Sequence, residues 1–225
     1  MADPRASVLA ICGMASEARL AARFAGRVIV SAADPARLAR ILAGEPLENY
    51  RLAVSFGLCG GLSPDLAAGR LVIADAVVTE TAHFAADPAF SQALRRANPD
   101  ASGGLIAGVD QALTDPAGKA ACHAGTGAIA ADMESHVMAE ACAKAGLPFI
   151  ILRAVSDDSE RALPPLAMSA LDSTGRLSIG AVIASLVRQP SQIALLPGLA
   201  RDSRRAFTRL EAAAASAATL FAGAA

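Results

Sequence analysis

The fold of this chain is decided by residues 131–158, which read ADMESHVMAEACAKAGLPFIILRAVSDD. Polar residues cluster at 132–136 after a short apolar run, and the apolar positions at 137–145 then recur with the period of an amphipathic helix. Gly146 and Pro148 are signals that end a helix. We therefore predict a strand in the apolar run 127–131 and a helix that follows the polar cluster.

A second strand is predicted immediately after this helix. Residues 149–152 form a continuous apolar run of strand length, which is typical of a buried parallel strand. Each strand delivers a carboxylate near its carboxyl end, Glu134 after the first and Asp157 after the second. Ligands bind at this edge in open α/β sheets, so we predict a ligand site there.

Composition favours an ordinary water-soluble α/β domain. The chain has 225 residues, enough for one domain over 1–225 with a full core. Charged residues make up 18% and the net charge is −1, which argues against a nucleic-acid partner. The sequence start does not read as a signal peptide, and the apolar runs are shorter than the roughly 18 residues of a membrane span.

Cysteine usage points to a reducing compartment. The four cysteines lack metal-ligand spacing and have apolar flanks, which suits buried thiols better than disulfides. We therefore predict a cytoplasmic protein with no metal and no cofactor.

Four segments in order carry a resemblance to a known family. Residues 132–135 (DMES), followed by a helix and then by 153–157 (RAVSD), resemble the signature of the purine nucleoside phosphorylase and methylthioadenosine/S-adenosylhomocysteine nucleosidase superfamily. Residues 56–62 (FGLCGGL) resemble its glycine-rich loop, and 71–75 (LVIAD) the strand after it. Residues 11–17 (ICGMASE) resemble the nucleosidase opening.

The resemblance covers roughly residues 7 to 190 and implies a fold and a subfamily. It implies a single-domain, three-layer α/β fold with a mixed central sheet flanked by helices, a C-terminal helical segment at about 191–221, and a homodimer. Within the superfamily the chain looks most like the hopanoid-associated phosphorylases, bacterial members linked to the trimming of adenosylhopane.

Cleavage of a purine nucleoside needs an acid for the purine and a negative group near the ribose. By resemblance, Asp157 is the acid that serves purine N7, Glu134 binds the ribose hydroxyls, and Met133 lies against the sugar. Asp157 must hold a proton near neutral pH, which we expect burial beside a second carboxylate to favour. Glu17 is the candidate base for water. The plainer alternatives are a helix N-cap for Asp157, helix-start carboxylates for Glu17 and Glu134, and core filling for Met133.

The remaining substrate contacts are expected from the two glycine-containing segments and from the end of the last strand. These residues are Met14, Gly57, Cys59, Gly60 and Ser156. A simple tight turn is the alternative for the glycines. The family usually has a glycine-containing turn near 31–35, where this chain reads SAADP, and no aromatic residue between Phe90 and Phe149 is available to stack on the purine.

The nucleophile is left open between water and phosphate. Phosphorylases of this superfamily hold phosphate with arginines and a serine of the glycine-rich loop, whereas the matching positions here are Ser55, Leu58 and Glu17. Leu58 offers no hydrogen bond to phosphate, and a carboxylate at 17 repels it but can deprotonate water. Backbone N–H groups at 57–61 could still cradle an anion. These residues lean towards hydrolysis, with phosphate retained as a candidate co-substrate.

Two surface features bear on a bulky or lipid substrate. Leu163 and the residues at 164–168 could line an apolar channel, or could simply pack as a lid. A basic helical face, formed by Arg201, Arg204, Arg205 and Arg209, is either a solvated surface or a weak contact with anionic lipid.

The leading function is therefore cleavage of the N-glycosidic bond of an adenine nucleoside, with adenosylhopane as the substrate favoured by resemblance. The alternatives are a methylthioadenosine/S-adenosylhomocysteine nucleosidase and a non-catalytic nucleoside-binding protein.

Overall fold

A computed structural model describes residues 4–163, 172, 174–176 and 196–223. The sequence also predicts a helix at about 176–188. That segment, the residues at 164–168 and the first residues of the C-terminal segment predicted from 191 lie largely outside the described residues.

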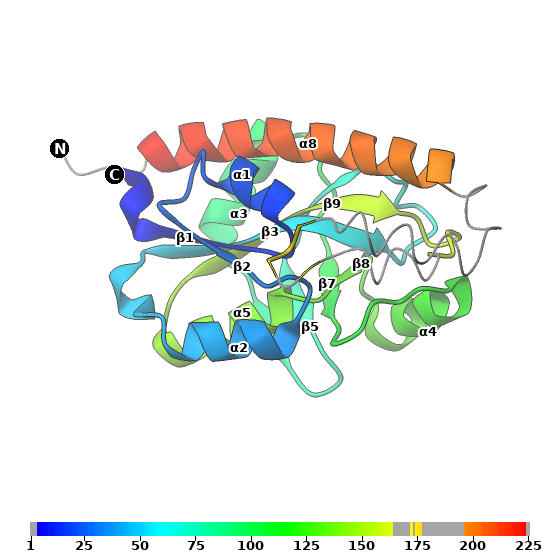
Figure 1. Ribbon diagram of the computed structural model, residues 1–225, viewed down its shortest axis with the longest axis horizontal. Helices are drawn as coiled ribbons and strands as arrows, with labels where there is room; N and C mark the ends of the chain where they lie inside the picture. Colours follow the sequence, from blue (N-terminus) through cyan, green and yellow to red (C-terminus); the bar gives the residue numbers. More distant parts are fainter. Residues whose placement is uncertain (1–3, 164–171, 173, 177–195, 224–225) are drawn as a thin grey trace.

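In the described part of the chain, the central element is a mixed sheet of nine strands (Figure 1). Parallel pairing joins β1 to β2 and β3, β9 to β3, and β7 to β5 and β8, whereas β3–β8, β4–β9 and β5–β6 are antiparallel. The strands are β1 (Val8–Cys12), β2 (Arg27–Val30), β3 (Leu52–Gly61), β4 (Leu71–Ile73), β5 (Ala76–Val78), β6 (His83–Ala85), β7 (Leu105–Gly108), β8 (Ala130–Asp132) and β9 (Phe149–Asp157).

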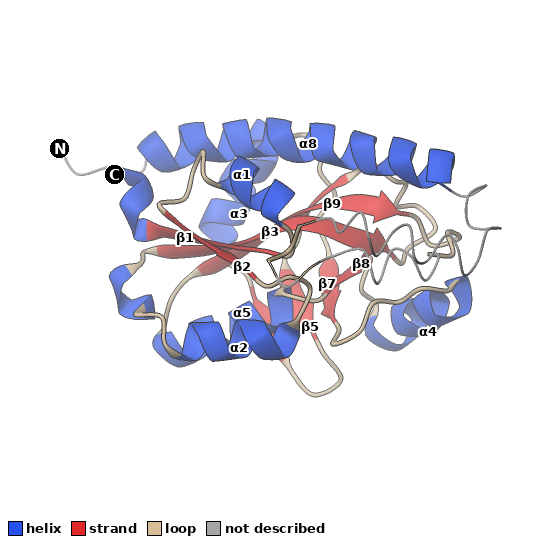
Figure 2. Ribbon diagram, in the orientation of Figure 1, coloured by secondary structure: helices blue, strands red, loops and turns tan. Residues whose placement is uncertain are grey.

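Helices cover both faces of this sheet, as Figure 2 shows. On one face α1, α3 and α8 pack over an apolar cluster, and on the other face α2 and α5 pack over a second cluster. The helices are α1 (Ala15–Ala21), α2 (Pro35–Ala43), α3 (Pro88–Ala97), α4 (Pro116–Thr126), α5 (Ser135–Ala145) and α8 (Leu196–Gly223), with 3₁₀ turns η1 (Pro4–Ser7) and η2 (Leu47–Asn49). The predicted mixed sheet flanked by helices is confirmed.

The central segment folds as its pattern predicts. Asp132 ends β8 and accepts a hydrogen bond from the Ser135 backbone N–H at 2.9 Å, which satisfies an otherwise unpaired donor at the start of α5. Gly146 ends that helix in the left-handed conformation, with φ of 67°. The chain then enters β9, which is almost completely buried.

Three helices begin with the same sequence device, an aspartate followed by a proline. Asp34, Asp87 and Asp115 each accept a hydrogen bond from the backbone N–H three positions on, at 2.8–2.9 Å. The proline occupies the first helical position, where its missing N–H is harmless.

The glycine-rich segment is a strand rather than the loop that its family resemblance implied. Residues 57–61 are the second half of β3, paired with β9 along one side and with β8 at Gly60 and Gly61. Between Cys59 and Gly60 the register of β3 against β9 shifts by one residue, which leaves Ser156 of β9 in a bulge. Because β1, β3 and β9 are parallel, their carboxyl ends meet at one edge of the sheet.

The long helix α8 lies across one face of the molecule (Figure 1). Arg201, Arg204 and Arg205 on this helix are exposed, and the predicted contact with anionic lipid remains a prediction. Within the described part of the chain, no helix combines the length and apolarity that crossing a bilayer requires.

Candidate active site

A cavity of about 370 Å³ opens at the carboxyl edge of the sheet, within the usual size of small-molecule sites. Among the residues that the structure describes, its charged lining consists of Glu17, Lys119, Asp132, Glu134, Arg153 and Asp157. Its apolar part includes Leu58, Leu113, Leu163 and Leu199. A ligand with one polar and one apolar end fits such a lining.

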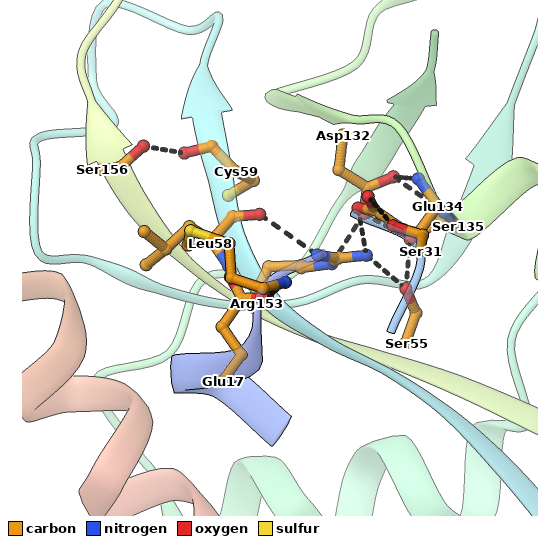
Figure 3. Close-up of polar contacts among 11 residues, drawn as sticks. Glu17, Ser31, Ser55, Leu58, Cys59, Asp132, Glu134, Ser135, Arg153 and Ser156 are labelled. Atoms are coloured by element: carbon orange, nitrogen blue, oxygen red, sulfur yellow. Dashed lines mark hydrogen bonds and ion pairs between the residues drawn. The ribbon is translucent and has the colours of Figure 1, made fainter. Parts of the chain in front are cut away.

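Arg153 on β9 holds the carboxylates in the middle of the site (Figure 3). Its guanidinium, 1% exposed, lies 2.6 Å from Asp132 and 3.2 Å from Glu134, and it donates to the Ser55 hydroxyl at 2.6 Å. A buried guanidinium needs such partners, because an unpaired buried charge is strongly unfavourable. Arg153 therefore fixes the position of Glu134 beside the cavity.

Glu134, predicted as the ribose ligand, is oriented from two sides. Its Oε1 accepts from the Ser31 hydroxyl at 2.8 Å, and its Oε2 accepts from Arg153. Burial raises the pKa of Glu134, and Arg153 opposes that shift. The segment at 31–35, which lacks the glycine-containing turn usual in the family, reaches the site through Ser31. Ala32 and Ala33 adopt positive φ of 60° and 55° and line the cavity.

Glu17, the candidate base, sits in the first turn of α1 and is 2% exposed. Its two oxygens accept backbone hydrogen bonds from Met14 and Leu58, both at 2.8 Å. Burial raises the pKa of Glu17 to about 7, and the nearby Arg153 offsets part of the effect. A carboxyl with this pKa exchanges a proton near neutral pH, which suits a general base.

Asp157, the predicted acid, lies at the end of β9 and is 3% exposed. Its Oδ2 is 2.5 Å from Lys119 Nζ, and its Oδ1 accepts from the Ser156 hydroxyl at 2.6 Å. We expected a second carboxylate beside Asp157, and that expectation is wrong: the neighbour is an ammonium, because α4 places Lys119 under the end of β9.

These geometric features agree with what the chain resembles in sequence. The sequence model of the Phosphorylase superfamily matches residues 7–177. The chain belongs to this superfamily.

One relative with a known name is a nucleosidase. The 5′-methylthioadenosine/S-adenosylhomocysteine nucleosidase of Geobacillus thermodenitrificans strain NG80-2 is 30% identical over 136 residues, covering 49% of this chain and 58% of that protein. The match thus spans less than two thirds of the relative's length.

Solved structures confirm the phosphorylase-type fold. The Neisseria meningitidis 5′-methylthioadenosine/S-adenosylhomocysteine nucleosidase, in complex with methylthio-immucillin-A, has a TM-score of 0.65 at 18% identity and covers 94% of this chain and 97% of its own. The Helicobacter pylori strain 26695 futalosine hydrolase has a TM-score of 0.64 at 15% identity and covers 92% and 96%.

The cavity of this superfamily member gathers most of the residues predicted from sequence. Eight of the nine predicted site residues line the cavity: Met14, Glu17, Cys59, Gly60, Met133, Glu134, Ser156 and Asp157. Gly57, the ninth predicted residue, is not among the described lining residues but packs against Glu17. A Cβ at this position would come within 2.6 Å of the Glu17 carboxyl. Cys59 is a buried free thiol, and its carbonyl accepts from Ser156 at 3.2 Å.

Sequence reasoning missed four polar residues of the site: Ser31, Lys119, Asp132 and Arg153. Asp132 and Arg153 stand inside the motifs that were recognised, so their motif positions were a usable signal. Lys119 is one of only two lysines in the chain, but its sequence neighbours gave no indication of a site. Among the cavity-lining residues that the structure describes, none is aromatic, and the described residues include no group of three or more potential metal ligands.

Proposed function

We propose that this protein hydrolyses the N-glycosidic bond of an adenine nucleoside of the methylthioadenosine/S-adenosylhomocysteine type. The observation that carries the proposal is that Glu17 and Asp157 line one cavity together with Glu134. These are the residues expected for the base, the acid and the ribose ligand. The nucleosidase named among the relatives supports the same reaction class.

The proposed chemistry divides between two ends of the cavity. Asp157 donates a proton to the purine as its bond to the sugar breaks, so that the purine leaves as a neutral base. Glu134 accepts hydrogen bonds from the ribose hydroxyls, and its negative charge stabilises the positive charge that develops on the sugar. Met133 supplies an adaptable apolar surface against the sugar.

Water is favoured over phosphate as the nucleophile by the charges of the site. Both cations among the described lining residues are already ion-paired, Arg153 with Asp132 and Glu134, and Lys119 with Asp157. The Leu58 backbone N–H donates to Glu17, so it is not available to an anion. Glu17 itself would repel phosphate but can take a proton from water.

The apolar part of the cavity supports an apolar 5′ substituent. The Leu163 backbone N–H donates to the carbonyl of Thr114, the residue after Leu113, at 2.8 Å. Leu113, Leu163 and Leu199 of α8 all line the cavity. A methylthio group suits this lining. Adenosylhopane, whose substituent is also apolar, remains a prediction of the subfamily resemblance, as does the homodimer.

The test is adenine release from methylthioadenosine, S-adenosylhomocysteine and adenosylhopane, each with and without phosphate, with identification of the sugar product. We expect release from methylthioadenosine without phosphate, giving a free sugar. A phosphorylated sugar that forms only with phosphate would overturn hydrolysis, and exclusive release from adenosylhopane would favour the lipid substrate.

The Asp157→Asn variant tests the acid and the non-catalytic alternative together. We expect adenine release to fall about 10²- to 10⁴-fold, the usual contribution of a general acid, with nucleoside binding by calorimetry largely retained. The exposed Asp65→Asn is the matched control and should behave as wild type. A wild-type protein that binds methylthioadenosine but releases no adenine from any of the three substrates would support a binding protein instead.

A further inference from the structure

The Lys119 side chain is an unusual feature of the site. Lys119 is 1% exposed, and its Nζ lies 2.5 Å from Asp157 Oδ2, 2.7 Å from the Asp158 carbonyl and 3.0 Å from the Arg161 carbonyl. All three neighbours are acceptors. An ammonium has three N–H donors and a neutral amine only two, so the resting pair fits a charged lysine and an ionised Asp157.

An ionised Asp157 has no proton to give, although the proposed reaction needs one. The base creates a second requirement, because Glu17 accepts a proton only once it is ionised, above a pKa of about 7. An acid that acts alongside it must therefore keep its proton at neutral and higher pH, where an isolated carboxyl has lost it.

The Lys119–Asp157 pair meets this requirement because it carries one mobile proton. If the proton moves from Nζ to Oδ2, the new carboxyl donates to the amine lone pair, and the two remaining N–H groups still serve the two carbonyls. All three contacts survive in both forms, so the proton can move without leaving a buried group unsatisfied.

We propose that Lys119 is a positioning residue that supplies the leaving-group proton through Asp157, an inference that rests on the proposed nucleosidase function. In the reaction, the electron pair of the C1′–N9 bond moves onto the purine, N7 takes the proton from the Asp157 carboxyl, and that proton came from Lys119. Water adds to C1′ and its proton goes to Glu17. Solvent then carries a proton from Glu17 back to Lys119, so the cycle closes with nucleoside and water consumed and purine and free sugar formed.

The choice of amino acid agrees with this role. Lysine is rare in this chain, which has only two lysines among its 20 basic residues and otherwise uses arginine. A guanidinium is not deprotonated in proteins, whereas a lysine amine can be. A purely structural cation under β9 could have been an arginine, as Arg153 is.

Other charged groups also face the Lys119–Asp157 pair. Across the cavity these are Glu17, Asp132, Glu134 and Arg153, while the Cys59 thiol is buried close to Asp157. On the outer side, the Arg161 guanidinium pairs with Asp202 of α8 at 2.9 Å. Any test must therefore compare variants that leave all of these groups in place.

The experiment measures single-turnover adenine release from methylthioadenosine between pH 6 and 10 for wild type, Lys119→Met and Lys119→Arg. We expect the wild-type rate to persist above pH 7. Both variants should be at least about 10²-fold slower at pH 8 and should lose about a further tenfold per pH unit, because a lone carboxyl must then hold the proton. Lys144→Met, which removes an exposed lysine paired with Glu140, is the matched control and should keep the wild-type profile.

The outcomes separate this inference from the proposed function. If wild type releases adenine and Lys119→Met is slower by the same factor at every pH, Lys119 is only structural and the inference is overturned while the function stands. A wild-type pH profile in Lys119→Arg would also overturn the inference, because a positive charge that cannot give up a proton would then be enough for catalysis. If wild type releases no adenine, the proposed function fails and this inference fails with it.

Discussion

At the scale of single residues, the site depends on buried carboxylates that have different hydrogen-bond partners. Glu17 and Asp157 are equally buried, yet Glu17 is held by two backbone N–H groups and Asp157 by an ammonium. The same residue type can therefore serve as base at one end of the cavity and as part of an acid pair at the other.

The raised pKa of Glu17 predicts a pH-dependent stability. The folded protein binds the Glu17 proton more tightly than the unfolded chain, with a pKa of about 7 against 4.5. The resulting stabilisation is full below pH 4.5 and is lost as pH rises through 7, and it amounts to at most about 3 kcal/mol. Urea unfolding at pH 5.5, 6.5, 7.5 and 8.5 should show this fall in wild type.

The Glu17→Gln variant is the comparison for that series. Its absolute stability will differ because one backbone N–H loses its acceptor, so the informative quantity is the slope against pH. The slope should be smaller than in wild type. Equal slopes in the two proteins would show that Glu17 does not titrate in this range.

At the scale of elements, the sequence of β3 allows the Glu17 carboxylate of α1 to pack directly against this strand. At Gly57 the absence of a side chain leaves room for the Glu17 carboxyl, which would lie 2.6 Å from an added Cβ. Leu58, the next residue on β3, donates its backbone N–H to the same group. The strand β3 thus leaves space for the Glu17 side chain and fixes its orientation by a hydrogen bond.

Gly57→Ala should therefore damage catalysis without removing any reacting group. The added methyl must displace Glu17, and a misplacement of about 1 Å can lower the rate about 10²-fold. We expect adenine release to fall by about that factor while nucleoside still binds. Gly125→Ala on α4, where nothing lies within 4 Å of the added Cβ, is the control and should keep full activity. An active Gly57→Ala protein would remove the support for Glu17 as the base.

The elements also show which parts of the site local sequence could reveal. The helix α5 and the strand β9 each depend on residues a few positions apart, so periodicity and helix-end rules predicted them. Glu17, Glu134 and Asp157 stand in recognisable motifs for the same reason. The glycine segment was misread as a loop because its strand is defined by pairing with β8 and β9, which are distant in sequence.

The contacts that sequence reasoning missed are long-range ones. Lys119 reaches Asp157 across 38 positions and Ser31 reaches Glu134 across 103. No local sequence pattern predicts either contact, because Lys119 lies within the helix α4 and Ser31 directly follows the strand β2. Only the assembled sheet, which brings these segments to one edge, identifies their partners.

At the scale of the whole molecule, α8 joins the end of the chain to both the core and the cavity. Near its start, Leu199 and Ser203 line the cavity, whereas Ala213, Ala214 and Ala217 are completely buried against the sheet. The small alanine side chains let this long helix lie close to β9 and α1 (Figure 1).

The far end of α8 is anchored by Phe221, which predicts a loss of stability without a loss of function. The Phe221 ring is 1% exposed and packs edge-on against Phe24 at 5.8 Å and Phe90 at 6.0 Å. Phe221→Ala should lower the free energy of unfolding by about 3–5 kcal/mol, because it leaves a cavity among these rings. Since Phe221 does not line the active-site cavity, adenine release per folded molecule should be unchanged at low temperature. Urea unfolding and activity assays on this variant and on the exposed Thr219→Ala control would check both statements, and a stable Phe221→Ala protein would show that this end of α8 contributes little to the fold.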